Sequence, residues 1–529
     1  MTRLLLAPRI GAAARTLLAL FLLAGPVEGA DPGATARPIP ALEAAFDREL
    51  PALLVRDRVP GASAAIVHRG NVVWERAAGV VDRESQEPVA TETTFQVASL
   101  SKPVAALGVL LLVEEGRIDL DRPVWDYIES WRPKQPAYDL DGVTVRRLLA
   151  HRAGIGVHGY PGYAPWRALP PLLASLDGDT VGASRVALVA PPGAGVRYSS
   201  GGYTILQLLV EETTGERFAA FMDRRVLRPL GMTRSSFETP AAPTSVGQAG
   251  ARPSNATGHG WWGERLPAYR FREQAASGLY STPGDLARFL RVLWSAEVQA
   301  AVGISASTIE TMLAPVEGGG FALGFGLEPL PIRTSMGAPA VPGARIVSHN
   351  GANRGFRSIL AAAPDRGDGF VVLTNSDRAL AMTTDLLCAW GSWVTDLELA
   401  SCWAERKRRG TLLAVAIMLG VGLLLDCGAF VRRQRQRRLE PRPWWAPVER
   451  HTWVRWTRLG VSLALLAGWW LFWYTDEIAT RREGIEHFVP ASALPPTFFW
   501  LTLVLTAWCL LGTARWLVAV RALRPAGRR

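Results

Sequence analysis

Lysine is scarce in this chain of 529 residues, although the chain is basic overall. Only three lysines occur among the 58 basic side chains, at Lys102, Lys134 and Lys407, and all the others are arginine. Arginine keeps its proton in proteins, whereas a lysine that is shielded from water can lose it. A position that retains lysine in such a chain is therefore a candidate for proton chemistry.

Cysteine is almost as scarce, and four cysteines are too few for a disulfide framework. Cys427 and Cys509 lie in apolar segments, and Cys388 and Cys402 are 14 residues apart. If these 14 residues form one helix, the two sulfurs lie about 21 Å apart and cannot bond. The seven histidines show no metal-ligand spacing, so we expect neither a metal nor a cofactor.

The last part of the chain contains three apolar runs, at 410–431, 456–475 and 496–520, each long enough to span a bilayer. Ten tryptophans between 444 and 516 are typical of membrane interfaces. Nine arginines in the loop 432–458, against two in 476–495, predict that this loop and the C-terminus are cytoplasmic. Because much of the basic excess lies beside these runs, it indicates a lipid bilayer and no nucleic acid as partner. The spans also offer a surface for a homodimer.

Residues 1–30 have the pattern of a secretory signal, with arginines before an apolar run and small residues near 29–30. An uncleaved anchor is the alternative, and in both cases the region after residue 30 is exported. We therefore expect a signal peptide at 1–30, a periplasmic domain at 31–400 and a membrane domain at 401–529. The predicted location is the bacterial inner membrane, with the domain at 31–400 in the periplasm.

Residues 31–400 show two hairpin patterns, at 61–82 and 355–377, near the two ends of the region. Helical patterns lie between them, notably at 100–115 and 202–215. We predict an α+β fold in which the two chain ends close one antiparallel sheet beside a helical region.

Ser99 and Lys102 are three residues apart at the start of the apolar stretch 103–113. In a helix these two residues share a face of the first turn, where backbone N–H groups are unpaired. A desolvated lysine has a lowered proton affinity and can take the proton of a serine. The alternative is a capping serine beside a solvated lysine, and this pair alone does not decide between them.

Two further segments can complete a site. Tyr198 lies in a glycine-rich loop before an apolar helix, and a tyrosine facing a lysine ammonium can become partly phenolate and relay protons. His349 and Gly351 end a candidate strand, where glycine would let a substrate backbone approach. A tyrosine packed at a loop corner and a structural histidine are the alternatives.

In this order the three segments resemble the serine beta-lactamase and penicillin-binding-protein superfamily, whose signatures include Ser-x-x-Lys and Lys-Thr-Gly. The resemblance covers roughly 40–400 and includes "TTFQVASLSKP", "VTVRRLLAHRAGI", "YSSGGYTILQLL", "AASGLYSTPGDLARFL", "SHNGANRGFRS" and "GFVVLTNSD". It is closest to the branch of class C beta-lactamases, D-aminopeptidases, D,D-carboxypeptidases and esterases. It implies a beta-lactamase/transpeptidase-like antiparallel sheet flanked by helices, with a helical subdomain.

The resemblance also implies roles for particular residues. Ser99 would be the nucleophile, Lys102 its base and Tyr198 the relay to the leaving group. The backbone N–H groups of Ser99 and Ala352 would form the oxyanion hole. Four residues are expected to contact substrate: Ser200, His349, Gly351 and Asn353.

The chain departs from the beta-lactamase pattern at two of these positions. Ser200 stands where that pattern has asparagine, and His349 stands where it has the lysine that helps to hold a penicillin carboxylate. Efficient beta-lactamase action is therefore not expected. His151 and His259 are expected to brace a helix end and to pack in a loop, respectively.

The exported domain followed by three spans is similar to the membrane-anchored, prodrug-activating peptidases of nonribosomal peptide pathways. This resemblance implies removal of an N-acyl-D-asparagine cap from an acylated peptide precursor. A broad esterase or a D,D-carboxypeptidase is the main rival. A penicillin-type sensor and a non-catalytic binding protein on a hydrolase fold are two further alternatives.

Overall fold

The computed structural model describes residues 39–178, 185–240, 255–328, 345–395, 398–403 and 405–406. The signal segment expected at 1–30 and the three expected spans lie outside these ranges. Within the ranges that are described, no helix is both long and apolar enough to cross a bilayer. The described residues fall almost entirely within the predicted periplasmic region.

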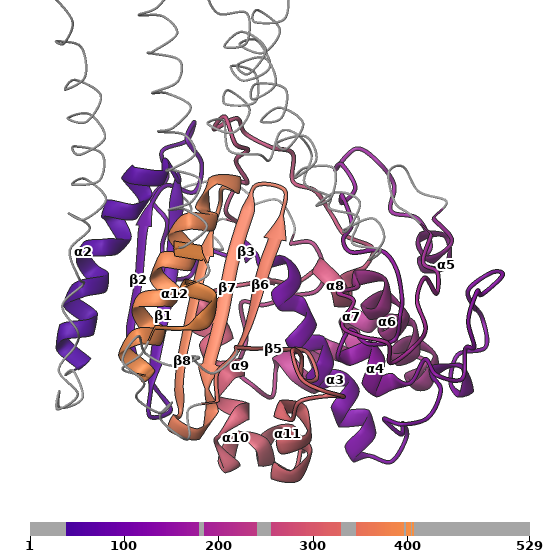
Figure 1. The fold of residues 1–529 in the computed structure, drawn as a ribbon. Helices are drawn as coiled ribbons and strands as arrows, with labels where there is room; N and C mark the ends of the chain where they lie inside the picture. Colours follow the sequence, from indigo (N-terminus) through magenta and orange to yellow (C-terminus); the bar gives the residue numbers. More distant parts are fainter. Residues whose placement is uncertain are drawn as a thin grey trace, which may run out of the picture.

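A six-stranded antiparallel sheet with the strand order β2-β1-β8-β7-β6-β5 organises the fold (Figure 1). Its strands are β1 (Gly61–His68), β2 (Asn71–Gly79), β5 (Gly326–Leu327), β6 (Val347–Asn353), β7 (Phe356–Ala363) and β8 (Asp368–Thr374). Strand β1 pairs with β8, and the Gly61 N–H donates to Asn375 Oδ1 at 2.8 Å across 314 residues of sequence. The two ends of the region therefore close one sheet, which confirms the predicted architecture.

Helices cover both faces of the sheet and build a separate helical region beside it. They are α2 (Ile39–Asp57), α3 (Ser101–Glu114), α4 (Val145–Leu149), α5 (Leu172–Leu176), α6 (Ser200–Thr214), α7 (Phe218–Met222), α8 (Gln274–Ser277), α9 (Pro283–Leu290), α10 (Ala296–Val302), α11 (Ala306–Leu313) and α12 (Leu380–Thr395). The chain-end helices α2 and α12 lie together against one face (Figure 1), where their apolar residues and those of the sheet form one core. Phe46 of α2 packs edge-on against Phe370 of β8, and Trp390 of α12 stacks on the same ring.

The second core lies between the opposite face of the sheet and the helical region, and α3 runs through it. Twelve of the 14 residues of α3 are buried, from Ser101 to Leu112. An apolar helix of this kind is stable only inside the protein. Its first turn, which comes directly after Ser99, is therefore held away from bulk water.

Both predicted hairpins form. Strands β1 and β2 join through Arg69 and Gly70, which both have positive φ (47° and 82°), as a tight hairpin turn requires. Strands β7 and β8 join through Pro364–Arg366 and Gly367, in the middle of the second predicted hairpin. A short second sheet pairs β3 (Phe95–Gln96) with β4 (Tyr280–Ser281), just before Ser99.

The expectation that Cys388 and Cys402 cannot bond is wrong. The two residues form a disulfide, with their Cα atoms 5.8 Å apart. The expectation assumed one continuous helix, but α12 ends at Thr395 and the chain folds back beside it. Gly391 makes this possible, because a Cβ there would lie 2.4 Å from the Leu399 side chain.

Candidate active site

Ser99 lies in a single 3-10 turn, η1 (Ala98–Leu100), immediately before α3. The preceding residue, Ala98, has φ 52°, a left-handed conformation that residues with a Cβ rarely adopt. Ser101 supports this turn, because its hydroxyl donates to the Ala98 carbonyl at 2.5 Å and accepts the Leu279 N–H at 3.0 Å. Local strain that the surroundings hold in place is a recurrent feature of functional sites.

The Lys102 amine is fully buried directly beside the Ser99 hydroxyl. Its Nζ lies 2.9 Å from Ser99 Oγ and 2.8 Å from the Ala276 carbonyl oxygen at the end of α8. Burial lowers the pKa of Lys102 well below the ordinary lysine value. The amine donates to the Ala276 carbonyl oxygen, which can only accept, and its lowered pKa favours the uncharged form that can take the Ser99 proton.

Tyr198 lies on the other side of the serine, two residues before α6. Its hydroxyl hydrogen-bonds with the Ser99 side chain, and the Lys102 amine lies 5.0 Å from the ring centroid. Burial raises the pKa of Tyr198, with the hydrogen bond from Ser99 opposing it. This direction favours the protonated phenol over the predicted partial phenolate. A lowered pKa of Lys102 likewise favours the uncharged amine, which would stabilise a phenolate less than an ammonium does.

His151 supports Tyr198 from behind. Its ring centroid lies 4.3 Å from that of Tyr198, and its Nδ1 accepts the Ser199 N–H at 3.1 Å. Ser199 in turn caps α6, because its hydroxyl accepts the Gly202 N–H at 2.9 Å. The prediction that His151 braces a helix end is thus confirmed, and the helix is the one that comes after the tyrosine.

Strand β6 forms the opposite wall of the site. Ala352 pairs with Arg357, one position from the closing pair Asn353 and Phe356 of the β6–β7 hairpin. Hydrogen-bonded and non-hydrogen-bonded pairs alternate along an antiparallel ladder, so the Ala352 N–H points away from β7. Strand β5 pairs only with residues 347 and 348 of β6, which leaves this N–H facing the cavity beside Ser99. The position suits the predicted oxyanion hole.

Gly351 sets the distance between β6 and the turn that carries Ser99. A Cβ at this position would lie 2.0 Å from Ser358 Oγ and 2.3 Å from the Val97 carbonyl oxygen. Those two atoms are themselves joined by a hydrogen bond of 2.8 Å. Only glycine lets the strand approach this closely.

A cavity of about 480 Å³ opens over the serine. Its lining includes six of the predicted site residues, namely Ser99, Tyr198, Ser200, His349, Ala352 and Asn353. Lys102 and Gly351 lie directly behind this lining, against Ser99 and the η1 turn. The structure therefore brings together all eight residues predicted from the sequence, from segments more than 250 residues apart.

The Asn353 side chain is already held by hydrogen bonds within the protein. Its amide nitrogen donates to Gln96 Oε1 at 3.0 Å and to the Ser277 carbonyl at 3.3 Å. These bonds connect the end of β6 to β3 and α8. Its predicted contact with substrate remains a prediction.

Sequence reasoning missed the role of α8. Ala276 of this helix supplies the carbonyl that orients Lys102, and Ser277 lines the cavity. The segment "AASGLYSTPGDLARFL" is one of those that carry the family resemblance. Every residue has a main-chain carbonyl, however, so the sequence does not show which one accepts a hydrogen bond. Arg357 and Asp377, an ion pair at 2.8 Å on the cavity wall, were missed as well.

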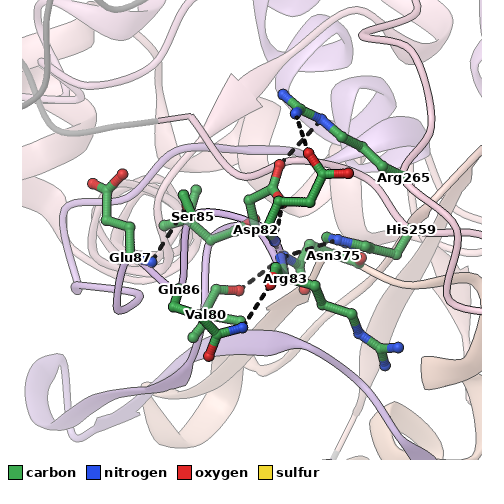
Figure 2. Close-up of polar contacts among 11 residues, drawn as sticks. Val80, Asp82, Arg83, Ser85, Gln86, Glu87, His259, Arg265 and Asn375 are labelled. Carbon is green, nitrogen blue, oxygen red and sulfur yellow. Dashed lines mark hydrogen bonds and ion pairs between the residues drawn. The ribbon is translucent and has the colours of Figure 1, made fainter.

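His259 lies outside the cavity lining, as expected for a loop-packing residue. Its Nδ1 lies 3.2 Å from the Asn375 carbonyl oxygen, and its Nε2 accepts the Arg83 N–H at 3.5 Å (Figure 2). In the same view Arg265 pairs with Asp82 at 3.1 Å, and the Asn375 amide donates to Val80. The loop-packing prediction for His259 is confirmed.

Comparison with known proteins agrees with this geometry. The family model described as Beta-lactamase matches residues 44–386. The chain belongs to the beta-lactamase family. The match thus supports a serine hydrolase of the beta-lactamase family, as the sequence resemblance implied.

The matches include both esterases and penicillin-binding proteins. Esterase EstB of Burkholderia gladioli is 30% identical over 288 residues, which cover 50% of this chain and 73% of the esterase. Penicillin-binding protein 4 of Amycolatopsis lactamdurans is 28% identical over 369 residues, or 66% of this chain and 89% of that protein. A solved structure, the octameric penicillin-binding protein homologue from Pyrococcus abyssi, aligns with a TM-score of 0.51 and 25% identity over 70% of this chain and 80% of its own.

Proposed function

We propose that this chain hydrolyses amides or esters through an acyl-enzyme on Ser99. The observation that carries the proposal is the buried Lys102 amine, 2.9 Å from Ser99 Oγ, which among the described residues takes part in no ion pair. Burial without an ion pair favours the uncharged amine, which can act as a base, whereas a salt bridge would favour the ammonium.

The chemistry is set by these positions. Ser99 Oγ attacks the substrate carbonyl carbon while its proton passes to Lys102, and the carbonyl oxygen becomes an oxyanion facing the Ser99 and Ala352 N–H groups. The proton then passes through the Tyr198 hydroxyl to the leaving nitrogen or oxygen, and the C–N or C–O bond breaks. Water repeats the sequence on the Ser99 ester, which releases the acid and restores the serine.

For the substrate, we propose an N-acyl-D-amino-acid cap of the D-asparagine type on a nonribosomal peptide precursor. Ser200 at the start of α6 lines the cavity where the beta-lactamase pattern has asparagine, as in the prodrug-activating peptidases that the sequence resembles. A lipid-tailed cap would partition into a bilayer, so the apolar segments after 410 would hold the enzyme beside its substrate. The Cys388–Cys402 disulfide supports a periplasmic location, because such bonds persist in oxidising compartments.

The test is release of product from N-acyl-D-asparaginyl amides by the purified full chain. Wild type is expected to release the acyl-D-asparagine, the L-epimers are expected to react more slowly, and Ser99→Ala is expected to be inactive. Labelling of Ser99 by a fluorophosphonate reports on the nucleophile independently. Absence of both labelling and release would refute the proposal.

A broad esterase is the second candidate, favoured by the 30% identity to Esterase EstB. Short-chain p-nitrophenyl esters distinguish the two. Turnover of esters with no release from any D-aminoacyl amide would replace the peptidase assignment by the esterase assignment.

A further inference from the structure

The chain that follows α12 runs back along this helix toward its start. Leu399 lies against Gly391, where an added Cβ would be 2.4 Å from the leucine side chain. Three residues later, Cys402 is bonded to Cys388, one turn nearer to the start of α12. Later residues of the returning segment therefore contact earlier residues of the helix, and the disulfide fixes this direction.

The first predicted span begins close to where this segment ends. Residue 410 comes four positions after Arg406, the last residue that the structure describes. Four residues of fully extended chain cover at most about 14 Å. The three positions between them are all basic in the sequence, which suits an anionic membrane surface. The span predicted at 410–431 would thus enter the bilayer near the end of the domain where α12 starts.

Three arginines from separate segments meet at this end of the domain, namely Arg58, Arg83 and Arg378. The Arg378 guanidinium donates to the Asp57 carbonyl oxygen at 2.8 Å and to the Trp261 carbonyl oxygen at 3.1 Å. Arg83 donates to the Arg58 carbonyl oxygen at 2.7 Å. Figure 2 shows the Arg83 side chain extending away from the contacts around His259. The ends of α2 and β2 and the start of α12 therefore share one cationic surface.

No carboxylate of the described residues forms an ion pair with any of these three arginines. Their neighbours Arg56 and Arg265, by contrast, each pair with two carboxylates. Burial lowers the pKa of Arg378, and the nearby charges of Arg58 and Arg83 lower it further. Since like charges repel one another, an anion from outside the domain would stabilise this surface.

Two exposed apolar side chains flank the arginines. Trp262 is 62% exposed and Leu380, the first residue of α12, is 54% exposed. Trp262 follows Trp261, whose ring centroid lies 5.7 Å from the Arg378 guanidinium carbon. The acidic side chain of this loop, Glu264, accepts the Trp262 N–H at 2.9 Å. Exposed tryptophan and leucine beside arginine are typical of surfaces that enter the headgroup region of a bilayer.

This surface borders the active-site cavity. Asp377, between β8 and α12, lines the cavity and accepts the Gly355 N–H at 3.1 Å. Gly355 lies against Gly258, because an added Cβ on Gly355 would be 2.7 Å from the Gly258 Cα atom. The loop that carries Trp262 therefore contacts the turn between β6 and β7, next to the cavity wall.

We propose that a docking patch, formed by Arg58, Arg83, Trp262, Arg378 and Leu380, binds the anionic phospholipid headgroups of a bilayer and turns the active-site cavity toward the membrane. The guanidinium groups would bind phosphate, while the tryptophan and the leucine enter the interface. A lipid-tailed substrate would then reach the cavity without leaving the bilayer. This last step rests on the proposed function, whereas the docking itself does not.

The experiment measures amide hydrogen exchange of the full chain in lipid nanodiscs that hold one chain each. Discs of phosphatidylcholine alone are compared with discs that also contain phosphatidylglycerol. Exchange in the loop 258–266 is expected to be several-fold slower in the anionic discs, because each arginine near an anionic surface favours docking by about fivefold. Inorganic phosphate added to the neutral discs is expected to give no such protection, since it offers no interface for the apolar side chains.

Variants assign the protection to the patch. Arg58→Gln/Trp262→Ser is expected to lose most of the protection by anionic lipid. The matched control is Arg69→Gln/Val72→Ser, which also removes one exposed arginine and one exposed apolar side chain, at the opposite end of β1. The control is expected to keep the protection, and thermal melts check that both variants fold.

A second measurement tests the orientation of the cavity. Two fluorophosphonates, one with a long alkyl tail and one with a short alkyl group, are compared as labels of Ser99 in anionic discs. The tailed probe is expected to label Arg58→Gln/Trp262→Ser several-fold more slowly than wild type. The short probe is expected to label both proteins equally, because it reaches the cavity from water.

Equal exchange of the loop in neutral and anionic discs would overturn the docking. Equal protection by inorganic phosphate, or an equal loss of protection in Arg69→Gln/Val72→Ser, would overturn it too. If the patch variant loses protection but the tailed probe labels it as fast as wild type, the orientation of the cavity is refuted. If neither probe labels Ser99, the proposed function fails, while lipid-dependent protection of the loop would still support the docking.

Discussion

Replacing Gly351 by alanine tests whether the spacing between β6 and the Ser99 turn controls the chemistry. The new Cβ would lie 2.0 Å from Ser358 Oγ and 2.3 Å from the Val97 carbonyl oxygen, and both distances are shorter than any real Cβ contact. One neighbour is a side chain and the other is backbone next to the nucleophile turn. The strand must therefore move away from the turn, and the Ala352 N–H moves with it.

The expected cost has two parts. Overpacking of this kind destabilises a core by about 1–3 kcal/mol. Misplacing one oxyanion donor costs about 100- to 1,000-fold in kcat. We therefore expect Gly351→Ala to fold with a lowered melting temperature, and to lose more than about 100-fold in the rate of Ser99 acylation.

A double variant separates the two contacts. Ser358→Ala alone removes the hydrogen bond to Val97 and is expected to cost about 1 kcal/mol, with little effect on acylation. In Gly351→Ala/Ser358→Ala, the hydroxyl clash is gone while the backbone clash remains. Stability should recover in part, and acylation should not. Fluorophosphonate labelling and denaturant unfolding measure the two quantities, and an unimpaired labelling rate in Gly351→Ala would refute the reasoning.

Further predictions concern the proton path and the disulfide. Lys102→Met is expected to lower acylation by about 100- to 10,000-fold, measured by labelling, and normal labelling would exclude this lysine as the base. Burial lowers the pKa of Lys102 in the folded chain, so the unfolded chain binds more protons between that lowered pKa and the ordinary value of about 10.4. The free energy of unfolding of the wild type should therefore rise with pH in that window relative to that of Lys102→Met. If urea unfolding gives the same pH dependence for both proteins, this is contradicted. Tyr198→Phe should impair release from amides more than from activated esters, whose leaving groups need no proton; equal losses would argue against the relay. Cys388→Ala/Cys402→Ala should cost about 3 kcal/mol of stability with little change in labelling, and an unchanged unfolding midpoint would show that the bond contributes nothing.

The sequence predicted what depends on local pattern. The two hairpins, the helix after Ser99 and the i, i+3 placement of Lys102 follow from residue periodicity and turn chemistry. The closure of β1 against β8 followed from strand patterns at both ends of the region. The match to the beta-lactamase family and the cavity that gathers the predicted site residues agree with that interpretation.

What the sequence could not show depends on contacts between distant segments. The Ala276 carbonyl that orients Lys102 is 174 residues away and is a backbone atom. The raised pKa of Tyr198 depends on how completely the fold buries its side chain. The Cys388–Cys402 bond depends on where α12 ends, and helix ends are among the least certain features of a sequence pattern.

The pairing of β1 with β8 has a consequence for biosynthesis. Asn375, whose side chain accepts the Gly61 N–H at the end of β1, is synthesised 314 residues after Gly61. At translation rates of about 5–20 residues per second, this interval lasts roughly 15 to 60 s. During this interval the apolar strand β1 and the apolar helix α3 lack their final packing partners. Because these contacts join residues far apart in sequence, we expect the nascent chain to need chaperones until β8 has been synthesised.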